Sequence, residues 1–343
     1  MSVDTWLRDC LVCPRDHDHL FEDRGALICT QGHRYPVVDG VPVMLLDDVS
    51  QTFGAARASL DRALHGTADV RAAHLYLESV EISEDEKQGA LALASQHPAI
   101  DPVVSYLVAA TNGLMYRHLR GRLTTYPIPE IGLPDGEGRT LLDVGCSWGR
   151  WTIAASRRGY RAVGIDPSLG AVMAARRVAR DLHIPAAFIV GDARYLPFAT
   201  AAFDTVFSYS VLQHFSRQDA ARATSEIGRV LHANGLAKVQ MPTRFGVRGL
   251  YHQARRGFSD GAGFDVRYWG VGELRRLFTE RVGRTRITVE GYFGIGLQQT
   301  DAHLMTTARR AVLTTSRWLT SASRRMPWLT AVADSVYVEA VKA

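Results

Sequence analysis

The fold is decided by residues 140–166, TLLDVGCSWGRWTIAASRRGYRAVGID, in which two strand patterns flank one helix pattern. Residues 140–144 predict a buried strand, and the glycine-containing loop 145–149 leads into a helix over 150–158. Residues 161–166 predict a second strand, which ends on an acid. A strand, a helix and a second strand in this order predict a parallel βαβ unit.

The same alternation continues along the chain. Helix patterns cover 169–182 and 219–231, and strand patterns cover 186–190, 203–208 and 235–241. Beyond them we expect a helix over 271–278 and a strand around 285–293, which pairs antiparallel with a last strand over 335–340. We therefore predict an α/β fold with a doubly wound sheet.

Acids follow three successive strands, at the sheet edge where ligands bind in folds of this kind. Asp143 precedes the glycine loop, Asp166 ends the second strand and Asp192 follows the third. Asp166 can bind two ribose hydroxyls, and Asp192 can reach an adenine amino group. The full G-x-G-x-x-G motif of dinucleotide sites is absent. The pattern predicts a ligand with one nucleoside, the alternative being that both acids only cap helices.

Several short motifs follow the predicted strands and helices. They are DVGCSWG at 143–149, GIDPS at 164–168, GDA at 191–193 with LPF at 196–198, SVLQHF at 210–215 and EIGRVLHANG at 226–235. Together these motifs resemble those of class I S-adenosylmethionine-dependent methyltransferases. The resemblance covers about 141–242 and departs at Ser147, where the family usually has glycine. It implies a Rossmann-like fold and S-adenosylmethionine as the cofactor.

The resemblance also implies a role for each residue of the cofactor site. The loop 145–149 would pass beneath the methionine part, with Asp143 supporting its ammonium group. Asp166 would hold the ribose, while Asp192 and Ala193 would read the adenine edge. The predicted cofactor-binding residues are Asp143, Gly145, Cys146, Ser147, Gly149, Asp166, Pro167, Asp192, Ala193 and Ser208.

His214 is the candidate catalytic residue. Methyl transfer needs chiefly proximity and orientation, and in some cases a base. His214 follows the fourth strand, and a neutral imidazole there could take a proton from a hydroxyl. The competing interpretation is a loop histidine that only packs or hydrogen-bonds.

The C-terminal part is expected to select the acceptor. An Arg-rich helical insertion near 301–330 is predicted to form a lid, which makes Arg309, Arg310, Trp318 and Tyr268 candidate acceptor contacts. On the N-terminal side, a helix around Tyr116 and Arg117 is expected to approach the carboxylate of the cofactor.

The first fifty residues contain a candidate zinc site. Cys10-x2-Cys13 and Cys29-x3-His33 are two pairs with metal-ligand spacing. The stretch 13–42 resembles the zinc ribbon of methyltransferase activator proteins and that of bacterial rRNA guanine-N1 methyltransferases. That resemblance places Cys13, Cys29 and His33 on ligand positions and leaves the fourth open among Asp16, Cys10, His17 and His19. The predicted ligand set is Cys10, Cys13, Asp16, Cys29 and His33, and the alternative is a metal-free hairpin.

Composition sets the broad class. Apolar residues make up 46% and charged residues 22%, which argues against disorder. We see no apolar run that could cross a bilayer and no secretory signal, so a cytoplasmic location is expected. The net charge of +5 is small for a nucleic-acid binder. The predicted organisation is a ribbon-like segment over 1–50, a helical cap over 51–137 and a cofactor-binding domain over 138–343.

Three functions are compatible with these features. The favoured one is methyl transfer to a small-molecule acceptor, such as a hydroxyl of a secondary metabolite or glycan. The second is an rRNA or tRNA base methyltransferase, which the ribbon supports but the missing Asn/Asp-Pro-Pro-Tyr/Phe loop disfavours. The third is a non-catalytic activator or partner of another methyltransferase. The sequence does not set the oligomeric state, and a homodimer is compatible with it.

Overall fold

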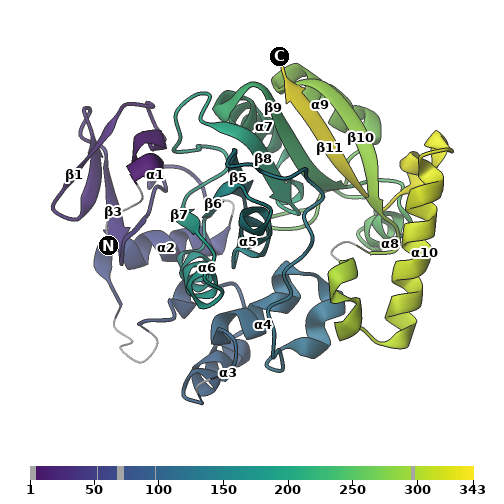
Figure 1. Ribbon diagram of the computed structural model, residues 1–343, viewed down its shortest axis with the longest axis horizontal. Coiled ribbons are helices and arrows are strands. Elements are labelled where there is room, and N and C mark those ends of the chain that lie inside the picture. Colours follow the sequence, from purple (N-terminus) through teal and green to yellow (C-terminus); the bar gives the residue numbers. More distant parts are fainter. Residues whose placement is uncertain (1–4, 52, 68–72, 97, 295–297) are drawn as a thin grey trace.

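The centre of the molecule is a seven-stranded sheet of order β10-β11-β9-β8-β5-β6-β7 (Figure 1). The structure is a computed structural model that describes residues 5–51, 53–67, 73–96, 98–294 and 298–343. Strands β5 to β9 are parallel and β11 is antiparallel to both its neighbours, which confirms the predicted α/β sheet and its edge. The strands are β5 (Thr140–Val144), β6 (Arg161–Asp166), β7 (Ala186–Val190), β8 (Phe203–Tyr209), β9 (Leu231–Pro242), β10 (Gly283–Gly291) and β11 (Ser335–Lys342).

Helices cover both faces of the sheet because adjacent strand residues point in opposite directions. Leu142 of β5 packs in one apolar cluster with Ile227 of α7 and Phe278 of α9. Its neighbour Leu141 packs in another cluster with Trp151 of α5. These helices, with the helix that follows β6, are α5 (Arg150–Arg157), α6 (Leu169–Asp181), α7 (Arg217–Val230) and α9 (Val271–Arg281).

A helical cap precedes β5. A capping box of Ser83 and Glu86 starts α3, and Asp101 accepts backbone hydrogen bonds at the start of α4. Asp101 also pairs with Arg177 of α6 at 2.5 Å, which fixes α4 against the main domain. The cap contains α2 (Gly54–His65), η1 (Leu77–Ser79), α3 (Glu84–Ala94), α4 (Pro102–Thr111) and η2 (Leu114–Leu119).

The N-terminal segment forms a small four-stranded sheet that is joined to the edge of the main one. The backbone N–H of Met44 donates to the carbonyl of Val190 in β7 at 2.7 Å. Cys13 and Tyr35 belong to the same apolar cluster as Val144, so the two sheets share a core. The segment consists of α1 (Thr5–Cys10), β1 (Leu20–Asp23), β2 (Ala26–Cys29), β3 (Arg34–Val38) and β4 (Val41–Pro42).

The C-terminal insertion surrounds β10. Its long helix α10 (Thr307–Ser323) packs on the end of that strand, where the Ser316 hydroxyl accepts from the backbone N–H of Tyr292 at 2.8 Å. The other elements of the insertion are η4 (Gln299–Leu304) and η5 (Pro327–Val332). A further helix, α8 (Val247–Arg255), lies earlier in the chain, between β9 and α9. Within the described ranges, every helix falls short of the length and apolar character that a membrane crossing requires.

Candidate functional site

A cavity of about 420 Å³ lies at the carboxyl ends of the parallel strands. Loops after β5, β6, β7 and β8 form its floor, and α4, α8 and the segment around Phe264 form its walls. The structure therefore brings most of the predicted site into one place. The predicted residues that line the cavity are Gly145, Ser147, Asp166, Pro167, Asp192, Ala193, His214 and Tyr268.

The other predicted cofactor residues do not line the cavity. Ser208 is buried and donates to the carbonyl of Val144 at 2.9 Å. Asp143 accepts a hydrogen bond from the Thr152 hydroxyl at 2.6 Å, and burial raises its pKa to about 7. Cys146 and Gly149 likewise belong to the loop interior, Cys146 being buried. These residues shape the loop from behind.

The glycine loop has backbone conformations that explain its sequence. Gly145 has φ 76°, and a Cβ there would lie 2.1 Å from a methyl group of Val211. Ser147 has φ 48°, a left-handed conformation that glycine adopts more readily. A serine thus adopts the left-handed conformation at the position where the family usually has glycine. Its backbone N–H donates to the Asp166 carboxylate at 2.9 Å.

Asp166 is the acid best placed to bind hydroxyl groups. One oxygen accepts from the backbone N–H of Ser147 and the other from that of Ser168, both at 2.9 Å. Each oxygen keeps a second lone pair. Burial raises the pKa of Asp166 to about 6. A pair of vicinal hydroxyls, such as those of a ribose, fits this carboxylate.

Asp192 has a partner that sequence analysis missed. The Arg194 guanidinium contacts its carboxylate at 2.6 Å and also donates to the backbone carbonyl of Ser50 at 2.8 Å. Arg194 is 6% exposed, so the two side chains form a buried ion pair. Asp192 and the neighbouring Ala193 still face the cavity, where both can contact a base edge.

His214 enters the cavity wall as a neutral imidazole. Its Nδ1 lies 2.7 Å from the carbonyl oxygen of Phe264, which places the proton on Nδ1 and makes Nε2 an acceptor. In this structure Nε2 accepts from the Gln213 Nε2 at 3.3 Å. The Phe264 ring stacks on the imidazole with centroids 3.9 Å apart. Burial is the main reason that the pKa of His214 is lowered, and the nearby positive charge of Arg267 lowers it further. The imidazole can therefore accept a proton near neutral pH.

Two amide side chains complete the polar lining, and sequence reasoning did not identify them. Asn112 follows α4, and Gln213 lies beside His214. Among the described residues, the Asn112 Nδ2 and the Gln213 Oε1 are buried polar atoms with no hydrogen-bond partner. One donor and one acceptor thus remain for a polar ligand. Only the tertiary packing of α4 brings Asn112 here, so no local motif could have indicated it.

Two expectations about cavity contacts are wrong. Arg309, Arg310 and Trp318 do not line the cavity, because α10 packs beside β10; the insertion near 301–330 stays a predicted lid. Tyr116 is buried and donates to the Asp301 carboxylate, so it does not reach the cavity. Arg117 does not line it either.

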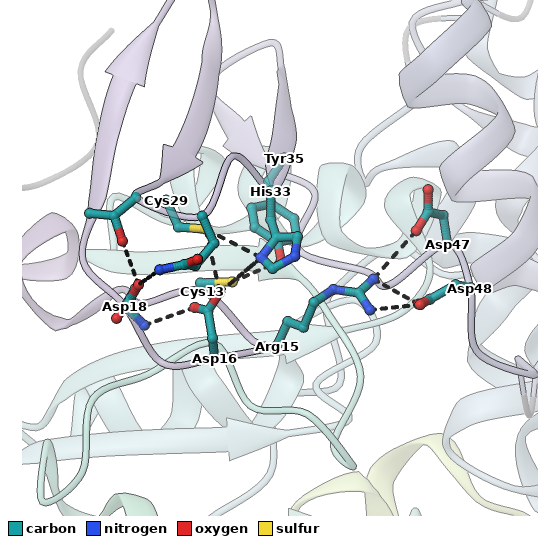
Figure 2. A network of polar contacts seen from close by, with 11 residues as sticks. Cys13, Arg15, Asp16, Asp18, Cys29, His33, Tyr35, Asp47 and Asp48 are labelled. Atoms are coloured by element: carbon teal, nitrogen blue, oxygen red, sulfur yellow. Dashed lines mark hydrogen bonds and ion pairs between the residues drawn. The ribbon is translucent and has the colours of Figure 1, made fainter.

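A second candidate site lies in the N-terminal sheet (Figure 2). The ligand atoms of Cys13, Asp16, Cys29 and His33 all lie within 4.8 Å of one another. The His33 Nδ1 is 3.5 Å from the Cys13 Sγ, 3.3 Å from the Cys29 Sγ and 2.9 Å from an Asp16 oxygen. The edges of a tetrahedral zinc site with such ligands are about 3.3 to 3.8 Å long. The two distances to sulfur fall in this range and the distance to the Asp16 oxygen is shorter. The donor set of two thiols, an imidazole and a carboxylate is one that zinc takes.

The distances show which residue joins Cys13, Cys29 and His33 as the fourth member of the cluster. Asp16 does, with its oxygen 3.6 Å from the Cys29 Sγ. Cys10, also predicted as a ligand, ends α1 and is not part of the group, and neither are His17 and His19. The Tyr35 hydroxyl lies 3.1 Å from the Cys13 Sγ and supports it from the core side.

Comparison with known proteins finds a family model that matches part of the chain. Residues 141–235 match a family model described as a methyltransferase domain. The chain is 31% identical over 137 residues to an uncharacterized methyltransferase of Mycobacterium sp. (strain JLS), which covers 38% of this chain and 50% of the relative. It is 28% identical over 108 residues to a ubiquinone biosynthesis O-methyltransferase of Azorhizobium caulinodans, covering 32% and 42%. The chain thus spans half or less of the length of these two relatives.

Solved structures show a more distant likeness. A SAM-dependent methyltransferase from Thermotoga maritima is similar at 17% identity and a TM-score of 0.42, over 62% of this chain and 84% of that one. The family match covers β5 through the start of β9, which are the strands whose ends border the cavity. Its description names a methyltransferase domain and specifies neither the methyl donor nor the acceptor.

Proposed function

We propose that this chain, whose residues 141–235 match a methyltransferase domain, transfers a methyl group from S-adenosylmethionine to a small-molecule acceptor. The observation that carries the proposal is the single cavity that Ser147, Asp166, Asp192 and His214 all line. We propose a cytoplasmic location as well. The acceptor atom we favour is a hydroxyl oxygen, because the cavity contains a histidine that can take its proton.

The cavity residues fit the parts of this cofactor. Asp166 would hold the ribose hydroxyls, and Asp192 with Ala193 would contact the adenine. The unpartnered Asn112 and Gln213 amides would bind polar groups at the methionine end or on the acceptor. S-adenosylmethionine supplies a methyl group on a sulfonium, from which it leaves readily.

The protein's own contribution is orientation and proton handling. His214 is held by the Phe264 carbonyl and by stacking on its ring, so the Nε2 lone pair has a fixed direction. An acceptor hydroxyl would take the place of the Gln213 amide, which lies 3.3 Å from Nε2. A hydroxyl bound against Nε2 would lose its proton as its oxygen attacks the methyl carbon. Walls of Phe53, Leu107 and Val211 keep water away from this place.

We also propose a structural zinc ion held by Cys13, Asp16, Cys29 and His33. The four ligand atoms come from two loops of the N-terminal sheet, which buries little core of its own. The ion would hold these two loops together. It has no part in the methyl transfer.

The experiment that tests the proposed activity uses radiolabelled S-adenosylmethionine with small-molecule extracts and total RNA in parallel. We expect label in the small-molecule fraction. Strong labelling of RNA would contradict the acceptor class and favour a base methyltransferase. Failure of the chain to bind S-adenosylmethionine in calorimetry would contradict methyl transfer altogether.

A further inference from the structure

Two segments, one of which borders the cavity, concentrate the positive charge of the chain. Residues 244–258 and 306–332 together contain nine of the 40 Lys and Arg residues, all nine being Arg, and none of the 35 Asp and Glu residues. The remaining sequence therefore has 31 basic against 35 acidic residues. Arg244 and Arg256 pair with acids of other segments, Glu273 and Asp265. The net positive charge of the protein thus comes from these two segments.

The two segments meet in space at Asp334. This buried carboxylate accepts from the backbone N–H of Arg248 at 2.7 Å, at the start of α8. Asp334 follows η5 directly in the chain, so the end of the second segment lies against the beginning of α8. Figure 1 shows α8 and α10 at the same end of the molecule.

The same segments carry most of the exposed large apolar side chains. On α8, Val247, Leu250 and Tyr251 are 63%, 40% and 56% exposed and lie on one face at spacings of three and four residues. Trp318 and Trp328 of the second segment are 69% and 65% exposed. In the described part of the chain, nine of the thirteen exposed large apolar side chains fall in these segments, namely Phe245, Val247, Leu250, Tyr251, Phe258, Trp318, Met326, Trp328 and Val332. Apolar groups gathered in this way indicate an interaction surface.

Helix α8 separates this surface from the cavity. Arg248, Gly249 and His252 line the cavity, whereas Val247, Leu250 and Tyr251 point to the outside. Whatever binds the outer face of α8 is therefore one helix away from the place where the acceptor must bind.

We propose that these two segments form a surface that docks on an anionic phospholipid bilayer, and that the methyl acceptor is a lipid-soluble molecule that enters the cavity beside α8. Exposed Trp, Tyr and aliphatic side chains among Arg residues match what a helix lying in a membrane interface needs. Five of the nine exposed apolar side chains are aromatic and could also stack on RNA bases, but Val247, Leu250, Met326 and Val332 could not. A bilayer interface accommodates both kinds, which favours it over RNA. The clause on the acceptor rests on the proposed function, whereas the clause on docking does not.

Docking is tested by co-sedimentation of the full chain with vesicles of phosphatidylcholine alone and with 30% phosphatidylglycerol. We expect binding to the anionic vesicles only, and its loss in high salt. Leu250→Glu should weaken binding at least tenfold, and Arg317→Gln about fivefold. The matched control is Leu64→Glu, a position on α2 that is 57% exposed and lies outside both segments; it should bind as the wild type does.

Several results would overturn the docking surface. The first is that the wild type does not bind anionic vesicles. The second is that Leu250→Glu binds them as well as the wild type does. The third is that RNA displaces the protein from vesicles while Leu250→Glu binds RNA as tightly as the wild type does. A circular dichroism spectrum and S-adenosylmethionine binding equal to wild type show that Leu250→Glu is folded. If that variant is misfolded, Arg317→Gln and the salt dependence decide.

The acceptor clause is tested with labelled S-adenosylmethionine and a total lipid extract dispersed in the same vesicles. We expect the label in the organic phase and a lower rate for Leu250→Glu. Label confined to water-soluble products would overturn this clause. Absence of S-adenosylmethionine binding would contradict the proposed function instead, and vesicle binding would still report on the surface.

Discussion

Replacing Asp166 with Ala should weaken S-adenosylmethionine binding by about 100-fold. The carboxylate lines the cavity at the end of β6 and has one lone pair left on each oxygen for a ribose hydroxyl. Two hydrogen bonds to a charged group contribute about 1.5 kcal/mol each, and their sum of about 3 kcal/mol corresponds to a dissociation constant about 100 times larger. Isothermal titration calorimetry of both proteins measures this difference.

The substitution also removes the acceptor of two backbone N–H groups, those of Ser147 and Ser168. A thermal melt must therefore accompany the titration, to show that the variant is folded at the temperature used. Asp135→Ala is the control, because Asp135 is an exposed acid that pairs with Arg158 away from the cavity. A folded Asp166→Ala protein that binds within threefold of wild type would refute the ribose assignment.

Four further results follow from the same geometry. The pKa of Asp166 is raised to about 6, and the ribose hydroxyls need its carboxylate form. The affinity for S-adenosylmethionine should therefore be full above pH 7 and about tenfold weaker at pH 5. An affinity that does not change with pH in calorimetry would count against the ribose-binding role of Asp166. His214→Ala should lower kcat about 100-fold or more with little change in S-adenosylmethionine affinity, and an unchanged rate would remove His214 as the base. Gly145→Ala should abolish cofactor binding because its Cβ has no room, whereas Gly272→Ala, where a Cβ meets nothing, should bind normally. Purified protein should contain one zinc ion by mass spectrometry, and removal of the ion with a chelator should lower Tm by about 5 °C or more. The Asp16→Cys variant should retain the metal. A metal-free protein whose Tm is unchanged would contradict the zinc site.

The sequence predicted the central sheet well because its signals are local. Each strand of the 140–166 stretch is a short apolar run that ends at a loop or an acid, and the structure places β5, α5 and β6 within a residue of the expected bounds. The same holds for Asp166 and Asp192, because a residue at the end of a parallel strand necessarily lies at the ligand-binding edge.

Tertiary packing explains what the sequence did not reveal. Asn112 reaches the cavity only because the cap folds over the strand ends. The ion pair of Arg194 with Asp192, two residues away in the same loop, is local, but no motif indicated it. The insertion was expected to contribute acceptor contacts on grounds of its length, but buried Leu313 and Ser316 turn α10 toward β10. In the ribbon, spacing alone could not choose between Asp16 and Cys10, since the choice depends on which loop faces Cys29.

A crystal structure of the protein with S-adenosylhomocysteine tests the central claim most directly. The account predicts the ribose against Asp166 and the adenine beside Asp192 and Ala193, with the sulfur on the side of the cavity that His214 lines. Density for the ligand at any other place, or an empty cavity at saturating ligand, would contradict it.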